Sequence, residues 1–324
     1  MVNIPDLLHL PQLTDDLHRI DVALRASVGS DDPFLGEVAS HLIVAAGKRI
    51  RPVLAVAAAA AGGADVGDDV VQGGVAVELV HLGSLYHDDV MDNALTRHGV
   101  ESVNARWGNL VAIVAGDFLL ARASEIAARL GTEVAGLLAA TIGRLCEGQV
   151  GEVQTAFNPG RTEAAYLSAI EGKTASLMAA ACRIGAITAG LDRPAIDALT
   201  EFGQSFGMAF QIRDDVLDFV STESELGKPT GHDLMEGVYT MPVIRALSLS
   251  HVEPELHALL GGVIDEPIRD KAVEIIRLSG ALEASLAVAR RYADAAADAM
   301  APVGGELGTA LAEFPHILLD TVEL

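Results

Sequence analysis

The sequence predicts an all-α protein, and three observations support this prediction. Half of the 324 residues are apolar but only 4% are aromatic, so the core must consist mainly of Ala, Val, Leu and Ile, which let helices approach closely. Alternating β-branched stretches joined by hairpin turns, the usual pattern of strands, are missing. Helical stretches instead follow one another from Leu7 onward. We expect one domain over residues 1–324, a helical bundle with about ten or more helices at roughly 20 residues each.

Short segments rich in Gly, Pro, Asp or Asn separate the expected helices, and no long Ser, Pro or Gly linker divides the chain. Four glycines inside the helices reduce helix propensity, which close packing between helices or the wall of a cavity would explain. These glycines are Gly83, Gly116, Gly185 and Gly203. The separating segments are 47–52, 62–69, 99–108, 158–161, 190–194, 227–237 and 261–267.

The composition excludes several classes of protein. A net charge of −23 without any Lys/Arg-rich block makes nucleic acid an unexpected partner. Cys146 and Cys182 lie far apart without a CxxC pattern, which is typical of buried thiols in a reduced protein. Apolar runs such as 53–64 are shorter than the roughly 18 residues of a spanning helix. The first residues resemble no signal or transit peptide, so we expect a cytoplasmic protein.

Two copies of the pattern DDxxD are the strongest chemical signal. Residues i and i+4 share one face of a helix, so each copy presents two carboxylates about one turn apart. A divalent cation such as Mg²⁺ offsets their repulsion, and it is usually bound by one or two carboxylates plus substrate phosphates. A solvated acidic face is the alternative, but both copies interrupt apolar text where unpaired charge is costly. The aspartates are Asp88, Asp89 and Asp92, and Asp214, Asp215 and Asp218.

Three of the four lysines lie beside glycines in settings suited to phosphate. Lys48 belongs to GKRIRP with Arg49 and Arg51, Lys173 to EGKTASL, and Lys228 to GKPTGHD. Lysine acts on phosphate as a point charge and arginine as a fork, so these cations and the paired aspartates together predict Mg²⁺-bridged diphosphate binding. Surface lysines at helix ends are the alternative, and for Lys228 alone it is equally good.

Two further polar residues share helix faces with the aspartates. His81 precedes Asp88 by seven residues, or two turns, so it can enter the same cavity as a substrate contact. A satisfied core histidine is the alternative. Gln211 precedes the three aspartates of the second copy by three, four and seven residues, which makes it a candidate hydrogen-bond partner for them or for phosphate.

With these motifs the sequence resembles the trans-isoprenyl diphosphate synthases, the polyprenyl synthetase family. The resemblance implies an all-α fold around a deep central cavity, usually in a homodimer, that joins isopentenyl diphosphate head to tail to an allylic diphosphate. Transient membrane contact during product release is a further expectation. The matching segments, in family order, are GKRIRP, ELVHLGSLYHDDVMDNALTRHG, AGDFLLARA, GKTASL, FGMAFQIRDDVLDF, GKPTGHDL and the turn at 240–242.

The resemblance also implies roles for single residues. Both aspartate motifs would bind several Mg²⁺ ions, the first on the allylic diphosphate and the second from the opposite wall. Asp88, Asp92, Asp214 and Lys173 would be catalytic, because Mg²⁺ and cations neutralise charge developing on the leaving diphosphate. The residues with an implied substrate-binding role are Lys48, Arg51, His81, Arg97, His98, Lys173, Thr174, Gln211 and Lys228.

Some positions depart from the family pattern or bear on product length. The usual Arg-Arg is Arg97-His98, and the usual acidic residue and lysine are Asn93 and Val238. These changes affect the expected affinity and pH profile more than the reaction class. In the family a bulky residue four or five positions before the first motif forms the tunnel floor, and here those positions are small, so we predict a geranylgeranyl or longer product. They are Ser84 and Gly83.

Three alternatives remain open. A class I terpene cyclase or head-to-head condensing enzyme shares the ionisation chemistry but normally lacks GKRIRP with a histidine such as His81. A noncatalytic partner subunit of a heteromeric synthase typically loses one aspartate motif, and both are intact here. An acidic scaffold without turnover would not concentrate its lysines in phosphate-type motifs. For residues 248–324 we expect packing rather than a cover over the cavity.

Overall fold

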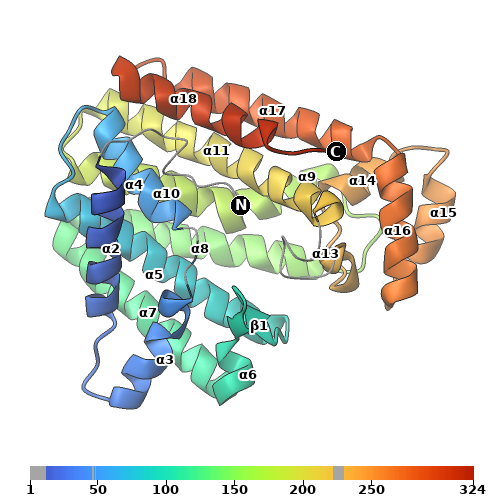
Figure 1. Cartoon of the computed structure of the whole chain (residues 1–324), viewed down its shortest axis with the longest axis horizontal. Coiled ribbons are helices and arrows are strands. Elements are labelled where there is room, and N and C mark those ends of the chain that lie inside the picture. Colours follow the sequence, from blue (N-terminus) through green and yellow to red (C-terminus); the bar gives the residue numbers. More distant parts are fainter. Residues whose placement is uncertain (1–11, 46, 48, 222–229) are drawn as a thin grey trace.

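The computed structural model describes residues 12–45, 47, 49–221 and 230–324, and these ranges are almost entirely helical. The all-α prediction is confirmed. Figure 1 shows α5, α8, α10 and α11 along the long axis of the molecule, with α2 crossing near one end and α16 near the other. The elements of the first half are α2 (Leu13–Ser27), α3 (Pro33–Val44), α4 (Ile50–Ala61), α5 (Asp68–Met91), β1 (Thr96–Arg97), β2 (Val100–Glu101), α6 (Val103–Trp107), α7 (Asn109–Leu130) and α8 (Thr132–Gln154).

The second half contains one long helix, α11, with shorter helices before it and after it. A π-helical turn, η1, interrupts the helical segment between α9 and α10. The elements are α9 (Glu163–Ile170), η1 (Glu171–Ala175), α10 (Ser176–Thr188), α11 (Arg193–Val220), α13 (His232–Met235), α14 (Met241–Leu247), α15 (Glu253–Leu259), α16 (Glu266–Leu278), α17 (Ala281–Ala299) and α18 (Gly305–Asp320).

A small hairpin, β1–β2, begins before the segment 99–108 that was expected to separate two helices and ends inside it. Arg97 pairs with Val100 in an antiparallel register. The two turn residues, His98 and Gly99, have φ of 51° and 77°, and a two-residue turn with both φ positive matches the right-handed twist of a hairpin. The hairpin follows the first aspartate motif directly and brings Arg97 back toward it.

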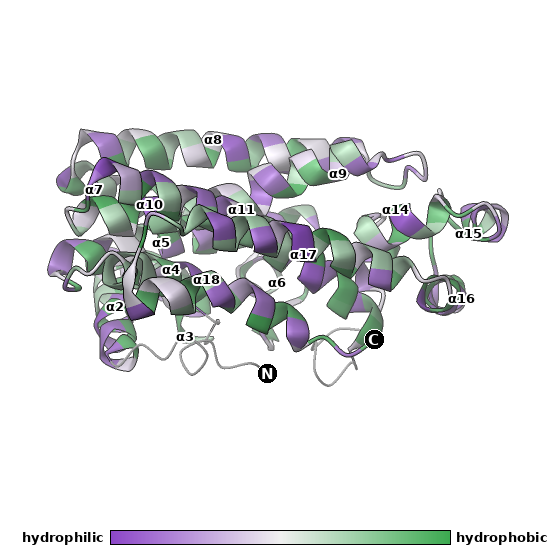
Figure 2. Ribbon diagram, turned by 90° about the horizontal axis from the view of Figure 1, so that it is seen from above, coloured by the Kyte–Doolittle hydropathy of each residue, from purple (hydrophilic) through white to green (hydrophobic). Residues whose placement is uncertain are grey.

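Two hydrophobic clusters form the core, and α11 belongs to both. Phe202 and Phe206 of α11 join the first cluster with α2–α8 and α10, whereas Ile212 and Phe219 join the second with α9 and α13–α17. The second aspartate motif therefore lies on the part of α11 that the second cluster surrounds. Figure 2 shows apolar and polar residues alternating along α8 and α17, as expected for helices with one buried face.

Glycines permit the closest helix crossings, as the sequence suggested. A Cβ on Gly185 would overlap the Ala55 carbonyl of α4, and one on Gly203 would lie 2.8 Å from the Met178 carbonyl of α10. The C-terminal segment packs as expected. Arg213 of α11 donates from Nε to the Leu318 carbonyl of α18 at 3.0 Å.

The prediction of two buried thiols is right for one cysteine and wrong for the other. Cys182 is buried in α10, whereas Cys146 is exposed on α8. Cys146 shares the outward side of α8 with exposed Val150 and Val153, and the missing CxxC pattern on which the prediction rested does not distinguish a buried thiol from an exposed one.

Candidate active site

The first aspartate motif ends helix α5. Asp92 is the C-cap residue, and its backbone N–H donates to the Asp88 carbonyl at 2.8 Å. Asp89 is fully buried, and Arg97 of β1 contacts its Oδ1 through Nε at 2.7 Å and Nη2 at 2.6 Å. Asp92 is exposed and Asp88 half-buried. The hairpin thus clamps the middle aspartate and leaves the outer two accessible.

The second motif lies within α11. Asp214 is exposed, whereas Asp215 and Asp218 are buried. Tyr166 of α9 donates its hydroxyl to Asp215 Oδ2 at 2.5 Å, and Gln211 donates from Nε2 to Asp215 Oδ1 at 2.8 Å. Both oxygens of the middle carboxylate therefore accept hydrogen bonds from the protein.

The turn η1 connects the two motifs. Lys173 Nζ lies 2.6 Å from Glu152 Oε1 of α8. Burial opposes the charge of Lys173, but Glu152, Asp88 and Asp92 outweigh it and raise the pKa. The next residue, Thr174, donates from Oγ1 to Gln211 Oε1 at 2.8 Å. One turn of backbone therefore carries a cation beside the first motif and a hydroxyl that reaches the second motif through Gln211.

Two glycines let η1 lie directly against α8. A Cβ on Gly148 would come 2.5 Å from the Lys173 nitrogen and 2.7 Å from the Ala169 carbonyl. A Cβ on Gly172 would come 2.6 Å from the Arg144 carbonyl. This close crossing at Gly148 and Gly172 holds the backbone of Lys173 directly against α8. Such π-helical turns often occur at functional positions.

Acidic residues in and directly after helix α13 are close enough to both motifs to affect the pKa values of their aspartates. Although the Asp92 residue is exposed, the protein around its carboxylate displaces part of the water there and raises its pKa to about 6, and Glu236 and Asp88 add to the shift. Burial also raises the pKa of Asp215 well above its usual range, with Asp233 adding to it. These carboxylates crowd one region from three helices.

The donor set fits a divalent cation. Burial raises the pKa of Asp88 against the opposing effect of Lys173 and Arg97, and a bound cation would relieve the crowding of charge. Asp89 Oδ2 is buried and has no hydrogen-bond donor among the described residues. No group of three or more His, Cys, Asp or Glu in the described ranges is arranged to hold a metal by itself.

A second group of cations surrounds His81 on α5. Its pKa lies well below the usual value because it is buried and because Arg51, His98, Arg97 and Arg49 are close. His81 is therefore neutral near pH 7 and available for hydrogen bonds.

Glu78 of α5 binds one of these arginines, Arg49, which directly precedes α4. Arg49 has a left-handed backbone with φ of 50°, and its guanidinium donates to Glu78 Oε1 at 2.8 Å and to the Ile43 carbonyl at 2.7 Å. The predicted site residues Lys48 and Lys228 lie outside the described residues.

The two positions predicted to set product length differ in their surroundings. Gly83 is buried against α7, where an added Cβ would lie 3.1 Å from the Gly116 carbonyl and 3.2 Å from Leu120 Cγ. Ser84 is half-buried and donates from Oγ to the His81 carbonyl at 2.8 Å. A bulky residue at Gly83 would have to displace α7, so Ser84 is the better position for testing the prediction.

Sequence reasoning missed Glu152, Tyr166 and Glu78. Glu78 precedes His81 by three residues, so the helix-face argument applied to His81 would have found it. Glu152 and Tyr166 reach their partners across separate helices, and no spacing in the sequence reveals those contacts.

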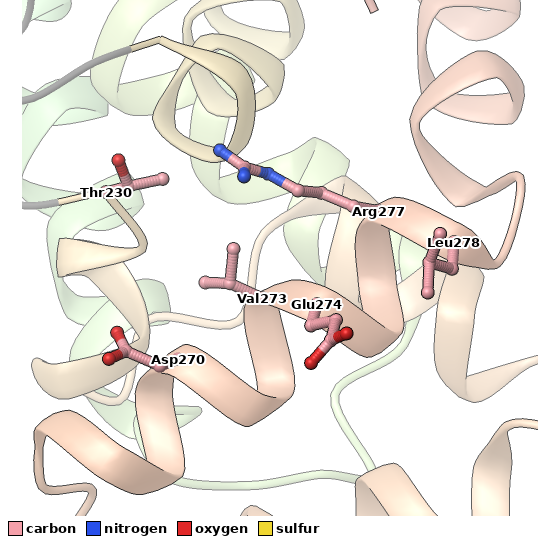
Figure 3. A pocket seen from close by; sticks show the side chains of 6 residues that line it. All are labelled: Thr230, Asp270, Val273, Glu274, Arg277 and Leu278. Atoms are coloured by element: carbon pink, nitrogen blue, oxygen red, sulfur yellow. The ribbon is translucent and has the colours of Figure 1, made fainter.

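A pocket of about 340 Å³ lies at α16, and none of the residues that line it is a predicted site residue (Figure 3). Arg277 points from α16 toward the end of α11, where its Nε donates to the Phe219 carbonyl at 2.5 Å. With Asp270 and Glu274 also on its wall, the pocket has no surplus of positive charge for phosphate.

No helix within the described ranges has the length and apolar character needed to cross a membrane.

Comparisons with known proteins identify the family of the chain. A family model described as polyprenyl synthetase matches residues 32–310. Heptaprenyl diphosphate synthase component 2 of Geobacillus stearothermophilus is 41% identical over 285 residues, covering 88% of each chain. Nonaprenyl diphosphate synthase of Mycobacterium tuberculosis is 37% identical over 295 residues, covering 90% of this chain and 88% of that protein.

Solved structures give the same result. A decaprenyl diphosphate synthase from Rhodobacter capsulatus superposes with a TM-score of 0.89 at 33% identity, covering 99% of this chain and 100% of that one. A polyprenyl synthase from Caulobacter crescentus CB15, complexed with calcium and isoprenyl diphosphate, gives 0.90 at 35% identity and 97% coverage of both chains. The chain therefore belongs to the polyprenyl synthetase family of prenyltransferases, as its motifs predicted.

Proposed function

We propose that this chain condenses isopentenyl diphosphate with an allylic diphosphate, head to tail and with Mg²⁺, to make a geranylgeranyl or longer polyprenyl diphosphate. The observation that carries the proposal is the position of η1 between the two motifs. Lys173 lies beside Asp88 and Asp92, and Thr174 bonds to Gln211, which itself donates to Asp215 of the second motif. A diphosphate held between two acidic clusters needs such cations to offset its own charge.

The accessible carboxylates are the proposed metal ligands. Asp92 and Asp214 are exposed and Asp88 is half-buried, while Asp89 and Asp215 are held by other side chains and support them. Asp218 is the buried member of the second motif and completes its predicted metal set. Bound Mg²⁺ supplies positive charge that stabilises the leaving diphosphate. The calcium and isoprenyl diphosphate in the Caulobacter crescentus synthase structure support a divalent cation here.

The cations have separate proposed tasks. Lys173, Arg97 and Lys228 grip the allylic diphosphate, although Arg97 already contacts Asp89 through Nε and Nη2 and has Nη1 outside that pair. Lys48 and Arg51, with His81 and His98, seat isopentenyl diphosphate. When the allylic C–O bond breaks, the double bond of isopentenyl diphosphate attacks the allylic cation, and the departing diphosphate accepts the proton that restores a double bond.

Product length is the finer part of the proposal. The small side chains at Gly83 and Ser84 favour a long tail, and relatives named heptaprenyl, nonaprenyl and octaprenyl diphosphate synthase support a product of that kind. Ser84→Phe should shorten the product if the tail passes this position, whereas an unchanged product would contradict the proposed floor.

A second copy of the chain is the proposed partner. Leu110 and Val114 of α7 and Val150 and Val153 of α8 are each more than half exposed. One residue connects the two helices, and α8 forms one edge of the molecule in Figure 2. Large exposed apolar patches mark interfaces.

The oligomeric state can be measured directly. Sedimentation should give twice the 33.7 kDa chain mass, and Val150→Glu should give monomers. A monomeric wild-type chain that is inactive alone would instead favour the alternative of a partner subunit in a heteromeric synthase. Two relatives named component 2 of heptaprenyl diphosphate synthase are the reason to test it.

One incubation tests the reaction. The purified chain is mixed with Mg²⁺, isopentenyl diphosphate and, separately, dimethylallyl, geranyl, farnesyl or geranylgeranyl diphosphate, and products are read by mass. We expect a ladder that ends at one long prenyl diphosphate. Consumption of the allylic substrate without incorporation of isopentenyl diphosphate would support a cyclase instead, and no consumption at all would overturn the proposal for the isolated chain.

A further inference from the structure

Tyr166 lies on α9 with its hydroxyl directed at the second aspartate motif. The side chain is 1% exposed, and its hydrogen bond to Asp215 Oδ2 is 2.5 Å long. Gln211 holds the other oxygen from within α11 itself. Tyr166 is thus the contact that fixes Asp215 relative to another helix, since a bond between Gln211 and Asp215 moves with α11 as a unit.

Arg161 fixes Tyr166 in turn. Its guanidinium lies over the Tyr166 ring, 5.5 Å from the centroid, and Nη1 donates to the Tyr239 carbonyl at 3.0 Å. Arg161 is only 5% exposed and forms no ion pair with a carboxylate among the described residues. A buried cation over the face of an aromatic ring attracts it and holds its orientation. The ring therefore has one defined position from which to donate its hydroxyl.

The same contacts extend to η1. Gln211, which bonds to Asp215, also accepts the hydroxyl of Thr174 at 2.8 Å. The chain of bonds runs from Tyr166 through Asp215 and Gln211 to Thr174, the residue after Lys173. Loss of the Tyr166 hydroxyl would therefore leave α11 less firmly positioned relative to both α9 and η1.

We propose that Tyr166 is a positioning residue for the second motif, holding Asp215 so that the neighbouring Asp214 is presented to metal and diphosphate. The inference rests on the proposed function, because it assumes that this motif binds the metal. Hydrogen-bond partners that orient the carboxylates of a metal site typically contribute 10–100-fold to metal affinity. Tyr166 would do for the second motif what Arg97 does for the first.

Tyr166→Phe is the decisive variant, because it keeps the ring under Arg161 and removes only the hydroxyl. Mg²⁺ is titrated calorimetrically into protein that holds inorganic diphosphate, and we expect Mg²⁺ affinity to fall by about tenfold or more. Tyr86→Phe is the matched control. It also loses a buried hydroxyl, one that donates to the Val38 carbonyl at 2.8 Å, and its Mg²⁺ affinity should equal that of wild type.

A second measurement separates positioning from general damage. In the elongation assay, Tyr166→Phe should need about tenfold more Mg²⁺ for half-maximal rate and regain most of the wild-type kcat at saturating Mg²⁺. Arg161→Lys, which keeps the charge but loses the planar contact, should shift the Mg²⁺ requirement less and in the same direction. Circular dichroism checks that each variant is folded.

The outcomes are distinguishable. Titrations of Tyr166→Phe that superimpose on those of wild type, or that shift only as far as those of Tyr86→Phe, would overturn the positioning role. If wild type makes no elongated product, the proposed function fails, while the calorimetric comparison still decides whether Tyr166 supports Mg²⁺ binding.

Discussion

The first aspartate motif ends helix α5, whereas the second lies inside α11. Both bury their middle aspartate, but the neighbours of that carboxylate differ. Asp89 is paired with the guanidinium of Arg97, which follows eight residues later in a hairpin. Asp215 is bonded by the neutral groups of Tyr166 and Gln211, and Tyr166 comes from a helix 49 residues earlier. The same five-letter pattern is thus stabilised by a local ion pair in one place and by long-range neutral donors in the other.

This difference has an electrostatic consequence. Burial raises the pKa of Asp89, and Arg97 opposes the shift with its charge and its hydrogen bond. Burial raises the pKa of Asp215 well above its usual range, Asp233 adds to the shift, and hydrogen bonds from the neutral groups of Tyr166 and Gln211 oppose it. A cation compensates a buried carboxylate more strongly than neutral donors do. The buried carboxylate of the first motif should therefore depend on Arg97 alone, whereas that of the second should depend on several hydrogen bonds.

The largest effects are expected where the two motifs are alike. Asp88→Ala and Asp214→Ala should each lower kcat by on the order of 10² or more, because each removes a group proposed to support the charge of the leaving diphosphate. Single-turnover product formation with isopentenyl and farnesyl diphosphate measures this. Asp69→Ala is the control, because Asp69 is exposed in the first turn of α5, away from the motif. A near-normal rate in both site variants would remove the support for a two-motif metal site.

Removing the side chain that binds the buried aspartate of each motif, Arg97 or Tyr166, should show how the motifs differ. Arg97→Gln leaves Asp89 buried without its cation and should lower the free energy of unfolding by about 2 kcal/mol. Tyr166→Phe removes one neutral donor and should lower it by about 1 kcal/mol. Urea unfolding at constant pH measures both. Adding Asp89→Asn to Arg97→Gln should recover part of the loss, whereas equal losses for the two single variants would contradict the contrast between an ionic and a neutral clamp.

Gly148→Ala should disturb both motifs at once through η1. The added Cβ meets the backbone of Lys173 and Ala169, and overpacking against backbone typically costs about 1 to 3 kcal/mol. Because Lys173 moves with that backbone, we expect a higher KM for the allylic substrate as well as lower stability. Gly136→Ala on the same helix is the control. Its Cβ meets nothing within 4 Å, so it should be stabilising or neutral, and equal behaviour of the two variants would contradict the close crossing.

The sequence predicted the helices and both aspartate motifs because their signals are local. Apolar periodicity and i, i+4 spacing depend only on helix geometry. The partner of Lys173 is 21 residues away on α8, and the partner of Asp215 is 49 residues away on α9. Those contacts depend on how helices cross, which spacing along one chain does not encode. Arg97 is an intermediate case. The sequence analysis gave it a role only in binding diphosphate. It predicted neither the positive-φ turn at His98-Gly99 nor the contact with Asp89 that this turn allows.

The smallest expected effect concerns pH and belongs to the cation-rich side of the first motif. Burial, followed by Arg51, His98, Arg97 and Arg49, holds the pKa of His81 well below its usual value. The folded protein therefore binds fewer protons at His81 than the unfolded chain, so this contribution to stability is present above about pH 6.5 and is lost as pH falls below it. His81→Gln removes the group that must be kept neutral. Urea titrations should show that this variant loses about 1 kcal/mol less stability than wild type between about pH 6.5 and 5.5. His257→Gln on α15 is the control, since His257 is exposed, and a His81→Gln profile parallel to wild type would show that His81 becomes protonated freely and that the surrounding arginines do not act on it.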